Sequence, residues 1–170
     1  MGPDGGTLMH WSRLADLPIL ALYSLFDLFL PSDTALVWAY SAWPPLSVLV
    51  VLGGLYAGAR HVSDRGAALA CLVLGVFVYA THYRFSPGAI DHHNLQLGLT
   101  ALAMGLALDP LRRAGRLVGA GLALAASVAI GGEVYVFVAA ICAFIALDWL
   151  VAGRAAMRGA IGFGAGLAAG

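Results

Sequence analysis

The residues best suited to chemistry form the run Asp91-His92-His93, which follows the helix-breaking pair Pro87-Gly88. Asp91 stands where it could cap the start of a helix, and its carboxylate and the imidazole of His93 are close enough to reach one ion. Oxygen ligands suit Mg²⁺ or Mn²⁺, and an added nitrogen favours Mn²⁺. We expect Asp91 and His93 to bind such a metal. The alternative is a simple cap with histidines at the level of the lipid headgroups.

Two further polar sites accompany this run. His10-Trp11-Ser12-Arg13 forms a second patch, in which Arg13 is a candidate phosphate contact and the alternative is a set of ordinary interfacial residues. Glu133 follows a glycine pair, and it could be a metal ligand, an acid in a ligand pocket or a charge that stabilises a helix N-terminus. A helix N-terminus at His92 would oppose a cation, so the metal would need carboxylates beyond Asp91.

The composition predicts a membrane protein. Of the 170 residues, 61% are hydrophobic and only 11% are charged, and the mean hydropathy is +0.88. Soluble domains are usually about a quarter charged. The net charge of zero, with no basic block, argues against nucleic acid as a partner. We therefore expect an all-α, polytopic transmembrane helical bundle.

The apolar runs predict a single domain with several membrane spans. Residues 1–36 form an external loop with an interfacial helix at Leu14–Leu30, residues 37–158 hold five spans, and residues 159–170 begin a further apolar helix. The expected spans are Val37–Ala59, Gly66–Tyr83, Asn94–Leu108, Leu117–Gly131 and Val134–Ala152. Leu14–Leu30 carries a narrow polar stripe between two prolines, which favours lying at the interface over crossing.

The arginines predict the topology, because all nine basic residues are arginine. If Leu14–Leu30 does not cross, only Arg13 and Arg84 are external, and seven arginines lie inside: Arg60, Arg65, Arg112, Arg113, Arg116, Arg154 and Arg158. If it does cross, Arg13 joins the inner set. In both cases the loop Arg84 to His93 is external. We also expect Asp148, near the inner end of the last span, to extend toward the boundary or to pair with Arg154.

The order of these features resembles the catalytic subunit family of oligosaccharyltransferases, within the C-type (multi-span membrane) glycosyltransferases. The similar stretches are Asp4-Gly-Gly-Thr-Leu-Met-His-Trp-Ser-Arg before an apolar helix, Trp43-Pro-Pro-Leu-Ser, Phe85-Ser-Pro-Gly-Ala-Ile-Asp-His-His and Gly131-Gly-Glu-Val-Tyr-Val-Phe. The last stretch departs from the family, which has Tyr directly after the glycine pair. The family's acidic motif after its first transmembrane helix and its soluble domain with a Trp-Trp-Asp motif have no counterpart here.

The resemblance implies a function on the non-cytoplasmic face of a membrane, expected to be the bacterial inner membrane. It implies that Asp91 and His93 hold a divalent metal, Mn or Mg, that binds the phosphates of a polyprenyl-phosphate-linked sugar donor. His92, Arg84, Arg13, His10 and Glu133 are then possible donor-phosphate or pocket residues. The acceptor stays unassigned, and we expect this chain to be a fragment that is inactive alone. The alternative is a transporter or channel-like protein, for which ionisable residues paired at mid-membrane depth are expected.

Overall fold

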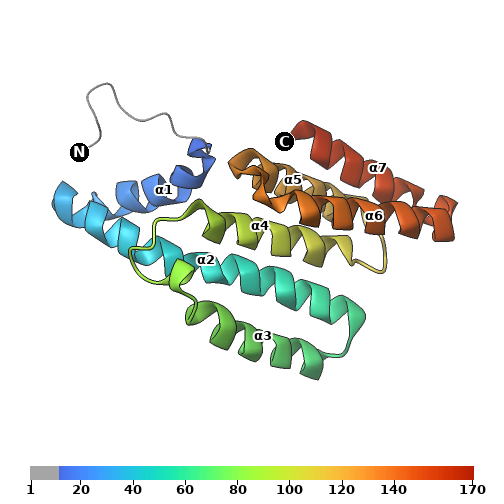
Figure 1. The fold of residues 1–170 in the computed structure, drawn as a ribbon, viewed down its shortest axis with the longest axis horizontal. Coiled ribbons are helices and arrows are strands. Elements are labelled where there is room, and N and C mark those ends of the chain that lie inside the picture. Colours follow the sequence, from blue (N-terminus) through green and yellow to red (C-terminus); the bar gives the residue numbers. More distant parts are fainter. Residues whose placement is uncertain (1–11) are drawn as a thin grey trace.

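The computed structural model describes residues 12–170, which fold into seven α-helices and three short 3-10 helices with no strand among them. Figure 1 shows the helices as a layered bundle. The α-helices are α1 (Leu17–Phe26), α2 (Ser32–Val62), α3 (Arg65–Ala80), α4 (His92–Ala107), α5 (Ala114–Ile130), α6 (Tyr135–Ala152) and α7 (Arg154–Ala169). The 3-10 helices are η1 (Arg13–Asp16), η2 (Tyr83–Phe85) and η3 (Gly132–Val134). The all-α prediction is confirmed for the described residues.

The long helix α2 organises the bundle, and it continues through Pro44 and Pro45. A proline inside a helix removes backbone hydrogen bonds. The hydroxyl of Ser47 donates to the carbonyl of Pro44 at 2.6 Å, which gives that carbonyl a side-chain partner. Ser47 is fully buried, so this bond is protected from water. The predicted first span is therefore present as one uninterrupted helix, and it starts five residues earlier than expected.

Glycines allow the backbones of two parallel helix pairs to approach closely. A Cβ atom built on Gly105 of α4 would overlap the backbone carbonyl of Gly54 of α2. Likewise, a Cβ on Gly166 of α7 would overlap the carbonyl of Val118 of α5. Only a residue without a side chain fits such an approach, as in helix pairs packed by small residues in membranes. These contacts set the α2–α4 and α5–α7 spacing and hence the position of the loop before α4.

The connections α2–α3, α4–α5 and α6–α7 lie at the same end of the bundle (Figure 1), and the seven arginines expected on the inner side lie in these connections or in the adjoining turns of the helices. Arg116 at the start of α5 contacts His61 at the end of α2, with 2.9 Å between their nitrogens. Arg112 of the α4–α5 connection binds Asp148 of α6 through two hydrogen bonds of 2.7 Å. The expected pairing of Asp148 with Arg154 is therefore wrong, because the guanidinium of Arg112 occupies both oxygens of this carboxylate.

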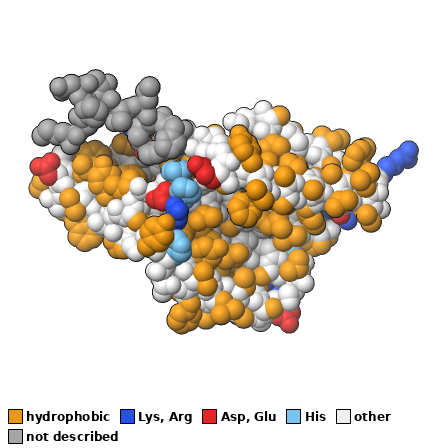
Figure 2. Space-filling view, viewed as in Figure 1, with side chains coloured by type: hydrophobic (Ala, Val, Ile, Leu, Met, Phe, Trp, Pro, Cys, Tyr) orange, Lys and Arg blue, Asp and Glu red, His pale blue; other side chains and the backbone are white. Residues whose placement is uncertain are grey.

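The face drawn in Figure 2 is strongly apolar. The buried residues are mainly alanine, glycine and other small or apolar residues, with a few polar side chains. Phe29 is 78% exposed and Val151 is 88% exposed. Among residues 12–170, two stretches are long and apolar enough to cross a membrane, Ser32–Val62 and Gly132–Ala152, and the second is largely exposed. The expected spans at α3 and α5 are apolar but shorter helices of 16 and 17 residues. Helix α1 has ten residues, roughly 15 Å at 1.5 Å per residue.

Candidate functional site

A buried aromatic ring and a backbone hydrogen bond hold the loop between α3 and α4 against α2. Phe85 is 2% exposed and packs with Val48 and Val51 of α2. Gly88 adopts a φ of +81°, which favours glycine, and its amide donates to the carbonyl of Tyr40 at 3.2 Å. The Pro-Gly break therefore turns the chain beside α2 and places the next residues at the start of α4.

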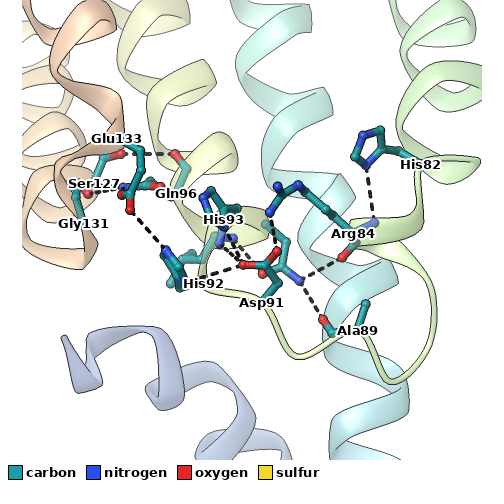
Figure 3. A network of polar contacts seen from close by, with 12 residues as sticks. His82, Arg84, Ala89, Asp91, His92, His93, Gln96, Ser127, Gly131 and Glu133 are labelled. Atoms are coloured by element: carbon teal, nitrogen blue, oxygen red, sulfur yellow. Dashed lines mark hydrogen bonds and ion pairs between the residues drawn. The ribbon is translucent and has the colours of Figure 1, made fainter. Parts of the chain in front are cut away.

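Asp91 caps helix α4, as the sequence predicts. Its Oδ1 accepts a hydrogen bond from the backbone amide of His93 at 3.1 Å. The same oxygen lies 2.6 Å from Nδ1 of His93, and Oδ2 accepts a hydrogen bond from the guanidinium of Arg84 (Figure 3). Both oxygens of this carboxylate are therefore engaged at once, and capping does not exclude a further role.

The surroundings of Asp91 keep its carboxyl group ionised. Burial by itself would raise the pKa of Asp91, but hydrogen bonds from the ring and backbone of His93 and the charge of Arg84 outweigh it, so the pKa lies below its usual value. A carboxylate that accepts from Nδ1 also sets the tautomer of the imidazole. The pair Asp91–His93 is thus preorganised for binding an ion or for holding a proton.

His92 connects this pair to Glu133, which lies in η3 between α5 and α6. Nδ1 of His92 lies 3.5 Å from Oδ1 of Asp91, and its Nε2 lies 3.9 Å from Oε1 of Glu133. The rings of His92 and His93 lie 4.1 Å apart between centroids. The tertiary structure therefore brings Glu133 to the Asp91-His92-His93 cluster, although they are about 40 positions apart in the sequence.

A buried amide, which the sequence interpretation did not single out, positions Glu133. The side chain of Gln96 is 2% exposed and donates to the carbonyls of Gly131 at 2.8 Å and Ser127 at 3.2 Å. Its nitrogen also lies 3.5 Å from Oε2 of Glu133 (Figure 3). A signal exists in the sequence, because Gln96 and Thr100 are four residues apart and share one face of an otherwise apolar helix.

The sequence interpretation also gave no role to the side chain of Asn94, which ties α4 to the preceding loop. Its side chain is 1% exposed and donates to the carbonyls of Arg84 at 3.2 Å and Ala89 at 3.3 Å. Buried amides are normally fully hydrogen-bonded, and this one holds both ends of the loop. Asn94 therefore fixes the backbone that carries Arg84 toward Asp91.

A cavity of about 270 Å³ opens beside the cluster. It is lined by Asp91 and His92, and also by Ala15, Asp16, Ile19, Trp43 and Ile90. Arg13, which forms an ion pair with Asp16 at 3.1 Å, lines an adjoining hollow with Tyr23 and Tyr40. Arg13 therefore lies near the cluster without contacting it. His10 lies outside the described residues.

The donor set is near the size that one metal ion requires, and any two ligand atoms as far apart as 4.8 Å would have to move closer together to bind it. One ligand atom from each of Asp91, His92 and His93 can be chosen so that all three lie within 4.8 Å of one another. Two ligands on one ion, with bonds of about 2.1 Å, lie no more than about 4.2 Å apart. An ion between Asp91 and His93 would have to replace the proton that they share, so binding would release protons. The guanidinium of Arg84 opposes a cation and favours an anion beside it.

Comparison with known proteins yields no match: no protein-family model fits the sequence, and neither curated proteins nor solved structures give a significant similarity.

Proposed function

We propose that this chain is part of a membrane glycosyltransferase of the C-type, similar to the oligosaccharyltransferase catalytic subunits. It would use a polyprenyl-phosphate-linked sugar donor on the non-cytoplasmic face of a bacterial inner membrane. The observation that carries the proposal is the convergence of Asp91, His92, His93 and Glu133 beside a cavity at one end of the bundle. Arg84 adds a cation to the same cluster.

The proposed membrane placement is a polytopic bundle with α1 lying at the external interface. Its support is the apolar outer surface, the two helices that could cross and the gathering of seven arginines at the end far from the Asp91-His92-His93 cluster. Arginine enrichment on one side is typical of the cytoplasmic side of membrane proteins. On this placement the shorter helices α3 and α4 cross beside α2, and α5 crosses beside α4, with their ends near the headgroups.

The proposed ligands are Asp91, His92 and His93, from the N-terminus of α4. Glu133 faces the far nitrogen of His92, so it can hold that ring in the tautomer that leaves Nδ1 for an ion. Arg84 is oriented toward Asp91 and can bind a donor phosphate oxygen. When bound, Mn²⁺ or Mg²⁺ would neutralise the leaving diphosphate.

The cavity suits the apolar part of such a donor, whereas its two carboxylates would repel the phosphates unless a bound metal ion stood between them. Its polar wall is Asp91, His92 and Asp16, and its apolar wall includes Ile19, Trp43 and Ile90. Transport, the alternative, would favour ionisable side chains paired at mid-membrane depth. The buried polar side chains Gln96, Thr100 and Ser127 instead bond to one another and to backbone carbonyls, which supports a structural role for the mid-helix positions.

The test measures Mn²⁺ binding to the purified full chain in detergent by electron paramagnetic resonance. We expect Asp91→Asn and His93→Ala each to weaken Mn²⁺ binding about tenfold or more. Matched controls are Asp33→Asn, an exposed carboxylate at the start of α2, and His82→Ala, an imidazole of the same loop. Both controls should bind Mn²⁺ like the wild type. Equal affinity in all five proteins would exclude the ligand assignment.

Donor binding is tested with farnesyl diphosphate as a short polyprenyl probe. The wild type should bind it more tightly with Mn²⁺ than with a chelator, and Arg84→Gln should reduce that difference. An affinity for farnesyl diphosphate that changes neither with Mn²⁺ nor with Arg84→Gln would contradict the proposed donor site.

A further inference from the structure

A second hollow, at the arginine-rich end of the bundle, belongs to no part of the proposed transferase site. It encloses about 450 Å³ between the last turns of α2 and α4 and the start of α5. Its lining comprises Arg60, Arg113, Arg116, His61, Tyr56, Ala57 and Leu106. Three of these seven side chains are guanidinium groups, so the chemistry of the lining selects an anion.

One buried carboxylate, Asp109, organises two of these arginines. Its side chain is 0% exposed, and Nε and Nη2 of Arg113 donate to its two oxygens at 2.9 Å each. Nη1 of Arg116 lies 3.7 Å from Asp109 and 2.9 Å from Nε2 of His61. The two guanidinium groups are therefore held in place before any ligand arrives, which lowers the entropic cost of binding.

The charges around the hollow do not cancel. Asp109 supplies one negative charge against the three arginines, and Arg60 forms no ion pair within residues 12–170. Arg113 binds Asp109 through Nε and Nη2, which leaves its Nη1 group for another acceptor. A phosphate group offers several oxygens to such donors and would neutralise the excess positive charge.

The residues of the hollow that are not basic favour the phosphate of a lipid over inorganic phosphate. Ala57 and Leu106 are apolar, and Tyr56 presents a ring with one polar end. These three residues lie closer to the middle of the bundle than the arginines do. The helices that carry them have apolar outer surfaces. A phosphodiester with an attached glycerol and acyl chain contacts both parts of this lining, whereas free phosphate contacts only the arginines.

We infer that the hollow formed by Arg60, His61, Arg113 and Arg116 binds the phosphate of an anionic phospholipid. Basic pockets between membrane helices on the cytoplasmic side bind such headgroups. This inference rests on the membrane placement proposed above, but not on the transferase activity. The occupant would anchor α2, α4 and α5 to one another at their cytoplasmic ends.

The experiment uses the purified full chain in nanodiscs of phosphatidylcholine, with or without phosphatidylglycerol, and native mass spectrometry to count retained lipids. The wild type should retain phosphatidylglycerol in preference to phosphatidylcholine. Arg60→Gln should weaken that retention about fivefold, equivalent to about 1 kcal/mol. Because Arg60 has no ion pair to lose within residues 12–170, this variant should fold normally.

Arg65→Gln is the matched control, since Arg65 begins α3 at the same end of the bundle but does not line the hollow. It should retain phosphatidylglycerol like the wild type. An equal loss in both variants would show diffuse attraction to negative lipid, and no loss in Arg60→Gln would likewise overturn the inference. Inorganic phosphate that displaces phosphatidylglycerol at equal concentration would overturn the lipid assignment.

The metal site and the lipid site can be tested independently of each other. Asp91→Asn should lose Mn²⁺ binding and keep phosphatidylglycerol, whereas Arg60→Gln should do the reverse. A wild-type chain that does not float with phosphatidylcholine vesicles would contradict the membrane placement itself.

Discussion

Nδ1 of His93 lies 2.6 Å from Oδ1 of Asp91, and the same oxygen caps helix α4 by accepting from the His93 backbone amide. One carboxylate therefore orients an imidazole and starts the helix that carries it. A second oxygen of Asp91 forms an ion pair with Arg84, and mutation can separate this pair from the cap, because the cap needs only an oxygen acceptor whereas the ion pair needs a negative charge.

Asp91→Asn and Asp91→Ala should differ in stability but not in metal binding. Asparagine keeps a cap, so Asp91→Asn should unfold near the wild-type temperature, whereas Asp91→Ala should lose about 1 kcal/mol. Both should lose Mn²⁺ affinity. Thermal unfolding of the full chain in detergent measures the first effect, and equal destabilisation by both changes would argue that the charge of Asp91 matters more than its cap.

Gly105→Ala should destabilise the α2–α4 pair, because the added Cβ would overlap the carbonyl of Gly54 and force the backbones apart. Overpacking of this kind costs about 1–3 kcal/mol. Gly53→Ala is the matched control, since a Cβ there meets nothing within 4 Å. A lower unfolding temperature for Gly105→Ala alone is expected. Equal temperatures for both variants would mean that the two helices do not pack closely.

Arg112 and Asp148 should show energetic coupling in a double-mutant cycle. Each is about one-third exposed, so solvent screening should keep the coupling small, though measurable, despite the two 2.7 Å bonds. Arg112→Ala, Asp148→Ala and the double variant are compared by thermal unfolding in detergent. A parallel cycle of Arg154→Ala with Asp148→Ala should give no coupling; coupling there instead would restore the pairing expected from sequence alone.

Asp109 should make stability depend on acid pH. The hydrogen bond from Arg113 holds the pKa of Asp109 well below its ordinary 3.8. A group whose folded-state pKa is lowered contributes stability above its unfolded pKa, and this stability is lost as the pH falls below 3.8 toward the folded-state pKa. Between about pH 6 and about pH 3, the wild type should therefore lose more stability than Asp109→Asn. Parallel curves for the two proteins would contradict this ion pair.

Gln96→Met should loosen the junction between α5 and α6. Methionine has a similar size but leaves the carbonyls of Gly131 and Ser127 without their donor, at a cost of about 1–3 kcal/mol. Hydrogen exchange at residues 131–135 should rise, because η3 loses its attachment to α4. Thr100→Ser, which keeps the neighbouring hydroxyl, should leave this exchange unchanged.

The sequence alone determined the helical class, the approximate helix positions, the cap at Asp91 and the loop that follows the Pro-Gly break. These features depend on local causes: apolar runs favour helices, and a carboxylate just before a helix accepts its first free amides. The helix ends differ from the expected ones by a few residues, since caps and short 3-10 turns decide them.

The tertiary structure decided which distant residues meet. Sequence spacing does not place Glu133 beside His92, Arg112 beside Asp148 or Arg116 beside His61, because each contact depends on how helices pack and on where each connection turns. Packing itself depends on glycines such as Gly54 and Gly105, whose partners lie on other helices. The sequence thus indicated which side chains could do chemistry. Which of them come together in the two proposed sites is decided by the packing of the helices.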